Sequence, residues 1–190
     1  MIKNLNFLKE RGGDLLSWES LAQVEDIVKS PVVNGYRNKC EFSVGLHPET
    51  QEITVGFRLA SYKKGSVSVV GVEDLPIVSD KMVQVTKHFE AFVRSSGLEP
   101  LNNISQKGYW KQLTVRTSNS GDCLVWVILH PQDMSQEAKD ALKQKLKAHF
   151  EQFKYDGENA VEDKGVNSLH IQFFIRKEKG ARIRCALETS

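Results

Sequence analysis

Segments with a two-residue hydrophobic period alternate with segments of helical period, and their order limits the folds open to this chain. From residue 30 to residue 176 the order is strand, strand, strand, helix, strand, strand, helix, strand. Strands in such an order pair mostly antiparallel, and the helices between them pack against the sheet. The sequence therefore predicts an α+β fold: a mainly antiparallel sheet with two helices on one face. From Ser66 onward the order is that of a split β-α-β arrangement, preceded by an extra hairpin.

The first predicted strand shows the two-residue period most clearly. Its mostly apolar row is Tyr36, Asn38, Cys40, Phe42 and Val44, and the residues between them are polar or charged. This pattern is typical of a half-buried antiparallel strand. The turn HPETQE and the segment ITVGFRL complete a predicted hairpin. The later segment CLVWVILH is nearly all apolar, which predicts a central strand.

The two predicted helices both begin at serine residues. Ser79 and Asp80 precede the first helix, which Gly97 ends, and Ser135 caps the second. Lys139, Lys143 and Lys147 are predicted to face water. Each helix has an apolar stripe with helical spacing: Met82, Val85, Phe89, Phe92 and Val93 in the first, and Ala138, Leu142, Leu146, Phe150 and Phe153 in the second.

The two ends of the chain have a different pattern from its centre. Residues 1–29 are predicted to be an N-terminal helical or linker segment, with an amphipathic helix after Gly12 and Gly13. Residues 30–176 are predicted to form one central domain. Residues 177–190 have no clear periodicity and are predicted to be a C-terminal tail.

Composition and motifs narrow the function classes. The net charge is only +2, so a nucleic-acid role would need local clusters of basic residues. Cys40, Cys123 and Cys185 are too far apart for a zinc site or a disulfide framework. The five histidines are scattered, and no phosphate-loop, dinucleotide-binding or hydrolase motif occurs. No segment approaches the roughly 20 apolar residues of a membrane span, and the N-terminus does not have the pattern of a secretory signal. We therefore expect no metal and no membrane.

Local basic clusters do occur. Arg37 and Lys39 are predicted to share one face of the first strand, and Lys63 and Lys64 to lie on a hairpin tip. In the strand WKQLTVRTS, one face is predicted to carry Trp110, Gln112, Thr114 and Arg116. Such a face could hold phosphate and stack a base. The same pattern also fits a solvated sheet face, and both interpretations stay open.

The order of elements also fits an RNA recognition motif. That module requires aromatic residues on its two central strands. Neither TVRTSNSG nor CLVWVILH supplies its signature. The sequence therefore argues against a stand-alone module of this kind.

Five segments in order, from Ser30 to Phe173, resemble the eukaryotic tRNA (uracil-5-)-methyltransferase family. They are SPVVNGYRNKCEFSVG, TVGFRLASYKKG, GYWKQLTVRTS, ILHPQDMSQEA and VNSLHIQFF. In the last, Asn167 and His170 stand where the family has Thr and Tyr. The resemblance implies a central domain that positions RNA, placed before a catalytic domain that binds S-adenosylmethionine. The segments expected of that catalytic domain, including a glycine-rich cofactor loop, do not occur in this chain.

The resemblance implies that the central and catalytic domains of the parent enzyme have separate roles. A catalytic cysteine would attack C6 of a uridine in the tRNA T-loop, and S-adenosylmethionine would methylate C5. We assign no catalytic residue, cofactor or metal to this chain, and expect it to be inactive alone. Its expected partners are tRNA and the enzyme's own C-terminal catalytic domain. We expect a cytoplasmic or nuclear location, with a mitochondrial one kept open.

Side-chain type and strand face, rather than the resemblance, give our candidate RNA-binding residues. They are Arg37, Lys39, Lys63, Lys64, Trp110, Lys111 and Arg116. As an alternative, the same residues belong to a scaffold domain that docks the catalytic domain without contacting RNA.

Overall fold

The computed structural model describes residues 25–59, 68–157, 164–174 and 188–189. The chain divides into two compact units, residues 1–31 and residues 32–190. In the first unit, residues 25–31 have no regular secondary structure, and Ile27 is fully exposed rather than part of a helix. The rest of the predicted N-terminal helix lies outside the described residues.

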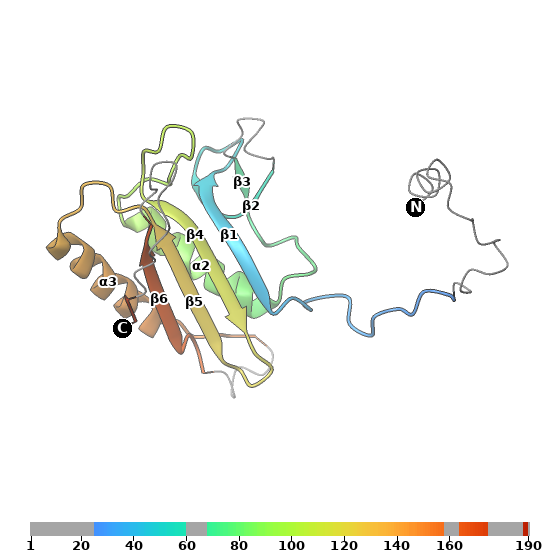
Figure 1. Cartoon of the computed structure of the whole chain (residues 1–190). Coiled ribbons are helices and arrows are strands. Elements are labelled where there is room, and N and C mark those ends of the chain that lie inside the picture. The colour runs from blue at the N-terminus through green and yellow to red at the C-terminus, as the bar shows by residue number, and fades with distance from the viewer. Residues whose placement is uncertain (1–24, 60–67, 158–163, 175–187, 190) are drawn as a thin grey trace, which may run out of the picture. The chain divides into compact units, whose positions relative to one another are not determined.

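The described strands of the second unit form one sheet with the order β3-β2-β1-β4-β5-β6-β7 (Figure 1). All neighbouring strands pair antiparallel except β5 and β6, which run parallel. The bounds are β1 (Lys39–Leu46), β2 (Ile53–Arg58), β3 (Val69–Val70), β4 (Trp110–Thr117), β5 (Cys123–Leu129), β6 (Ser168–Phe173) and β7 (Glu188–Thr189).

Two helices, α2 (Asp80–Ser95) and α3 (Gln136–Glu151), cover one face of this sheet (Figure 1). The core lies between the helices and the sheet, where Phe89 of α2 and Phe150 of α3 stack with ring centroids 6.3 Å apart. The inward rows of the strands include Phe42, Leu113 and Val127, all completely buried. Burial of each such side chain stabilises the fold by about 1.5–3 kcal/mol.

The predicted α+β class, the mainly antiparallel sheet and the element order are confirmed. The predicted split β-α-β pairing is wrong, because β5, α3 and β6 form a crossover between adjacent parallel strands. The hairpin of β1 and β2 lies between β3 and β4, so β3 and β4 are not neighbours in the sheet. The inward row of β1 explains this position, since Cys40 and Phe42 lie directly opposite Val115 and Leu113 of β4 and extend the same core.

The helices follow the predicted stripes with local differences. The stripe of α2 is buried as predicted, although the N-cap Ser79 makes no side-chain capping bond. The Ser135 hydroxyl does cap α3, accepting a hydrogen bond of 3.2 Å from the Ala138 amide. Ala138 itself is exposed rather than buried, because it lines an open groove beside the end of α2.

Two of the three lysines expected to face water are half-buried. The ammonium groups of Lys139 and Lys143 lie 5.8 and 5.7 Å from the ring centroid of Phe173. The parallel pairing of β6 with β5 places that ring beside α3. The predicted topology did not place β6 in this position. Lys147 is exposed, as predicted.

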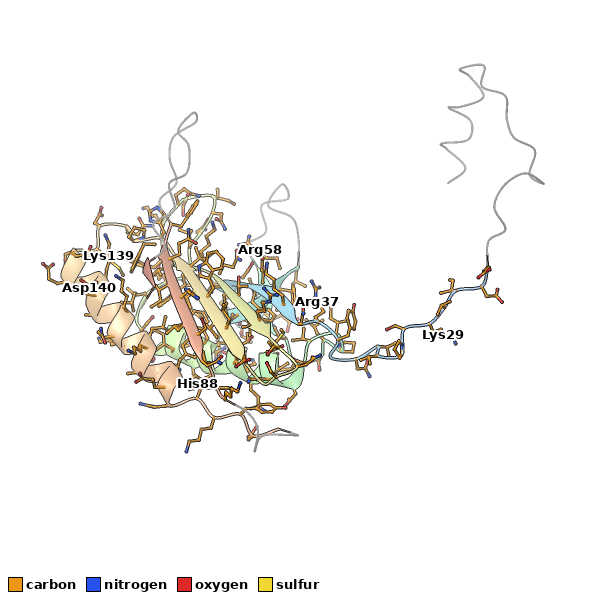
Figure 2. All side chains as sticks on the ribbon, turned by 60° about the horizontal axis from the view of Figure 1, so that its bottom comes forward. Lys29, Arg37, Arg58, His88, Lys139 and Asp140 are labelled. Atoms are coloured by element: carbon orange, nitrogen blue, oxygen red, sulfur yellow. The ribbon has the colours of Figure 1, made fainter. Side chains whose placement is uncertain are left out.

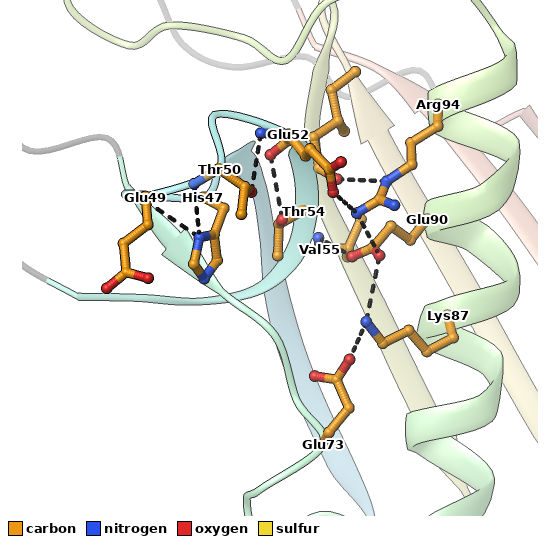
Figure 3. A network of polar contacts seen from close by, with 11 residues as sticks. His47, Glu49, Thr50, Glu52, Thr54, Val55, Glu73, Lys87, Glu90 and Arg94 are labelled. Carbon is orange, nitrogen blue, oxygen red and sulfur yellow. Dashed lines mark hydrogen bonds and ion pairs between the residues drawn. The ribbon is translucent and has the colours of Figure 1, made fainter.

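A buried carboxylate joins α2 to β2 (Figure 3). Glu90 is almost fully buried and accepts a hydrogen bond of 2.8 Å from the Val55 amide. Its other oxygen lies 3.3 Å from the Lys87 ammonium and 3.0 Å from the Arg94 guanidinium. Burying a charge is costly unless it is paired and hydrogen-bonded, and Glu90 meets both conditions.

A pair of stacked imidazoles joins α2 to α3. The rings of His88 and His149 lie 3.9 Å apart, and each Nε2 lies within 2.9 Å of the other residue's backbone carbonyl. Because a carbonyl can only accept, each Nε2 donates. Burial lowers the pKa of His88, and the bond to the His149 carbonyl opposes this without reversing it.

We predict that Glu90→Ala lowers the free energy of unfolding by about 2–4 kcal/mol, since it leaves the buried Val55 amide unsatisfied and removes a shared carboxylate. Urea denaturation measures the change. The matched control is Glu52→Ala, which removes an exposed carboxylate 3.6 Å from the same Arg94 and should cost less than about 1 kcal/mol. Equal losses in the two variants would contradict the role given to Glu90.

We predict a loss of stability on mild acidification. The lowered pKa of His88 means that the unfolded chain binds a proton more readily than the folded one below pH 6.5, the ordinary pKa of histidine. The melting temperature should therefore fall between pH 7.5 and pH 5.5. In His88→Gln, which cannot titrate, the fall should be smaller by about 2 °C or more. An identical pH dependence in both proteins would exclude His88 as its source.

Candidate nucleic-acid interface

The sheet face opposite the helices is mostly polar, and we call it the outer sheet face. Every second residue of each strand points to this face, because the residues between them lie in the core. Its side chains fall into three rows across β1, β4, β5 and β6: Lys39, Arg116, Leu124, Ser168; then Glu41, Thr114, Trp126, His170; then Ser43, Gln112, Ile128, Gln172.

Two of the predicted cations lie directly opposite each other on this face. Lys39 of β1 and Arg116 of β4 are register partners, and both side chains are exposed. The Lys39 ammonium also contacts the Glu41 carboxylate at 2.8 Å. Like charges in directly opposed positions destabilise a sheet. The Glu41 carboxylate offsets part of this repulsion, and an anion bound between the two cations would offset more of it.

The remaining predicted cations are placed differently. Arg37 precedes β1 and is separated from it by a bend at Asn38, so the predicted face shared with Lys39 does not continue to Arg37. Its backbone amide donates to Ile77 instead, and its side chain is exposed on the β1 side of the sheet (Figure 2). The neighbouring Tyr36 is exposed rather than part of a buried row. Lys63 and Lys64 lie outside the described residues.

Lys111 occupies a β-bulge, where the register between β4 and β5 shifts between Trp110 and Gln112. Its side chain is half-buried, and its ammonium lies 3.7 Å from the ring centroid of Phe174. This distance fits a cation–π contact. Lys111 therefore lies at the end of the sheet where β6 ends, away from the row of Lys39 and Arg116.

The bulge also corrects the predicted position of Trp110. One extra residue in a strand reverses the alternation on its far side, so Trp110 points into the core instead of sharing a face with Gln112. It is fully buried, meets Phe89 and Phe92 edge to face at 5.6 and 5.9 Å, and donates from Nε1 to the Ser96 hydroxyl at 3.1 Å. Trp110 is therefore unsuited to stacking an RNA base.

Among the described residues, the outer sheet face carries the indole of Trp126, which is not one of the candidates predicted from the sequence. It is half-buried in the central row, between Thr114 and His170. Within the described structure, Trp126 Nε1 and His170 Nδ1 are buried without hydrogen-bond partners. The alternation of CLVWVIL could have revealed it, because Cys123, Val125 and Val127 form the inward row.

Neither described cysteine has the surroundings of a reactive thiol. Cys40 and Cys123 are free and buried. Burial raises the pKa of Cys40, although the nearby Arg37 acts in the opposite direction, so little thiolate forms at neutral pH. Among the described residues, no three side chains of His, Cys, Asp or Glu gather to hold a metal ion. In the same residues, no helix is long and apolar enough to cross a membrane.

Known proteins match this chain over most of its length. No protein-family model matches it. It is 41% identical over 124 residues to the tRNA (uracil-5-)-methyltransferase homolog B of Homo sapiens, covering 65% of this chain and 25% of that protein. Homolog A of Mus musculus is 37% identical over 148 residues, covering 78% and 23%.

Two further proteins are also similar to this chain. The zinc finger CCCH domain-containing protein 24 of Arabidopsis thaliana is 41% identical over 108 residues, covering 57% of this chain and 12% of that protein. A crystal structure of a tRNA (uracil-54, C5)-methyltransferase of Pyrococcus abyssi in complex with S-adenosyl-L-homocysteine has a TM-score of 0.49 at 13% identity, covering 86% and 32% of the two chains.

The chain spans about a quarter of the length of the homolog A and homolog B proteins that it matches. The identities to these relatives confirm the resemblance seen in the sequence. By sequence, the chain belongs to the tRNA (uracil-5-)-methyltransferase family.

Proposed function

We propose that this chain is the RNA-positioning part of an S-adenosylmethionine-dependent tRNA (uracil-5-)-methyltransferase that makes 5-methyluridine in the tRNA T-loop. Methyl transfer would take place in another part of the longer protein, in a cytoplasmic or nuclear location. The family relationship supports the reaction class. The buried thiols of Cys40 and Cys123 support the assignment of chemistry elsewhere.

One observation carries the RNA-binding role. The outer sheet face places Lys39 and Arg116 side by side and holds Trp126 in the next row. Phosphate contacts of Lys and Arg supply most of the sequence-independent affinity for RNA, and an exposed aromatic ring adds base stacking. The face therefore offers a cation pair for the backbone and a ring for a base within two adjacent rows.

This chain would contribute to catalysis by positioning the tRNA. A uridine inside the folded T-loop must leave its stack before an enzyme can reach its ring. Lys39 and Arg116 would hold the backbone beside the loop, and Trp126 would support a neighbouring base. A fixed loop lowers the entropic cost of placing the target uridine. S-adenosylmethionine would supply the methyl group in the longer protein, and no residue of this chain is assigned to it.

A second function is favoured by the apolar part of the same face. Leu124, Trp126 and Ile128 form a half-buried strip along β5, and the Trp126 indole nitrogen has no partner among the described residues. A protein surface that covered this strip would remove its apolar atoms from water. On this alternative the face docks the catalytic domain and makes no contact with RNA.

We predict that the 190-residue chain binds tRNA with an affinity that falls steeply as salt rises. Arg116→Glu should weaken binding and lower the slope of log K against log salt by about 1, since each lost phosphate contact removes about one released counterion. Lys39→Glu should act similarly. Lys147→Glu changes an exposed lysine of α3 on the helix side and is the matched control. Filter binding or fluorescence anisotropy measures both quantities. A flat salt dependence would exclude the RNA role.

We predict that Trp126→Ala weakens tRNA binding by about 1–3 kcal/mol, the usual effect of losing a stacked base. The control is Trp110→Phe, which keeps an aromatic ring in the core and should leave tRNA affinity unchanged. Unfolding curves confirm that both variants are folded. Unchanged tRNA affinity in Trp126→Ala, combined with loss of association between this chain and the catalytic domain, would replace the RNA role with the docking role. The double variant Lys63→Glu, Lys64→Glu applies the same test, tRNA affinity against association with the catalytic domain, to the predicted hairpin tip.

A further inference from the structure

The sheet splits at one corner, and the split encloses a cavity of about 510 Å³. β1 and β4 pair only as far as Ser43 and Gln112. Beyond that point Trp110 pairs with the chain at Pro100 instead, through a hydrogen bond of 2.7 Å from the Leu101 amide to the Trp110 carbonyl. The end of β1 forms one wall of the cavity, and the loop of residues 99–107 forms the other.

The loop wall is held in place by its own hydrogen bonds. The Asn102 amide donates to the Lys107 carbonyl at 2.8 Å, and the Gln106 amide donates to the Asn102 carbonyl at 2.7 Å. Gln132, from the segment after β5, donates from Nε2 to the carbonyls of Gln106 and Gly108 at 2.9 and 2.6 Å. A cavity whose walls are already fixed binds a ligand at a smaller entropic cost.

The cavity combines aliphatic walls with a cationic rim. Its apolar lining comes from both sides of the split: Val44, Leu46, Ile53, Pro100 and Leu101. Arg58 and Lys107 supply two positive charges against the single negative charge of Glu99. Arg58 is held by the hydrogen bond of 2.9 Å from its Nε to the Ser43 hydroxyl. Aliphatic walls suit a flat base, and the two cations suit the phosphate attached to it.

Asn102 adds a polar group that can discriminate between ligands. Its Oδ1 accepts hydrogen bonds from the amides of Ile104 and Ser105 at 2.9 and 3.2 Å, which fixes the side chain. The amide nitrogen of the same planar group then has both its hydrogens available to donate. Uracil and cytosine each carry a ring carbonyl that could accept such a bond.

We propose that this cavity binds one nucleotide unit, with the base between the aliphatic walls and the phosphate at Arg58 and Lys107. Arg58 lines the cavity and donates to the hydroxyl of Ser43 on the outer sheet face, so the cavity adjoins that face. A nucleotide of a bound RNA could therefore enter it while Lys39 and Arg116 hold the same strand. This choice of an RNA strand as the source rests on the proposed function; a free mononucleotide has the same chemistry.

The test is an NMR titration of the ¹⁵N-labelled 190-residue chain with uridine monophosphate, ribose 5-phosphate and tRNA. Uridine monophosphate should shift the backbone amides of Leu46, Ile104, Ser105 and Lys107, and ribose 5-phosphate should shift them less. Ser105→Trp, which adds a large side chain at an exposed lining position of the cavity, should reduce tRNA affinity at least fivefold. Ser105→Ala leaves the cavity open and should stay within twofold of the unaltered chain. Lys107→Glu, at the exposed rim, provides a second variant.

The outcomes separate this proposal from the proposed function. If tRNA binds with a steep salt dependence but neither ligand shifts these amides and Ser105→Trp binds normally, the nucleotide cavity is wrong and the RNA role stands. If uridine monophosphate shifts them while tRNA does not bind, the cavity takes free mononucleotides and the RNA role is wrong. If neither uridine monophosphate nor tRNA binds, both are wrong, and a protein side chain becomes the occupant to test.

Discussion

The single extra residue in β4 determines what each face of the sheet presents. Pairing with β5 shifts between Trp110 and Gln112, so the alternation of β4 reverses at Lys111. On one side of the bulge, Trp110 packs against Phe89 and Phe92 and helps to hold α2 on the sheet. On the other side, Gln112, Thr114 and Arg116 lie on the outer sheet face. Without the bulge, Trp110 and Arg116 would lie on the same face of β4, so the indole could not enter the core while the guanidinium faced outward.

The bulge coincides with the point where β1 leaves β4. Trp110 still needs partners for its backbone groups, because it is buried away from water. The segment around Pro100 supplies them through Glu99 and Leu101. Gly108, with a φ of +96°, lets the chain pass close to the Pro100 carbonyl, where a larger residue would meet that oxygen. The cavity between β1 and the loop is thus a consequence of satisfying the backbone of one buried tryptophan.

Local signals predicted much of this fold. The stripe of α2, the cap of α3 by Ser135 and the inward row of Cys40, Phe42 and Val44 each depend on residues close in sequence. Two of the misses required knowledge of distant partners or of a bulge. The parallel pairing of β6 with β5 brings Phe173 beside Lys139 and Lys143, and nothing within α3 encodes that contact. The face of Trp110 depended on a bulge, whereas the alternation within β5 could have placed Trp126 on the outer face.

The two sides of the sheet differ in exposed charge and in the partners of their buried polar groups, and this difference bears on function. On the helix side, the Glu90 carboxylate finds its partners within the second unit (Figure 3). The paired rings of His88 and His149 do the same. On the outer side, two buried nitrogens of the central row have no partner among the described residues, and two cations lie opposite each other in the next row. Natural structures leave few buried polar groups unsatisfied. Since Ser79 Oγ at the start of α2 is also buried without a partner among the described residues, exposed charge is what distinguishes the outer face, and an external anion would gain most there. Glu41 already offsets part of the charge of Lys39, so a bound polyanion would act mainly on Arg116, whereas an apolar protein surface would cover the strip along β5.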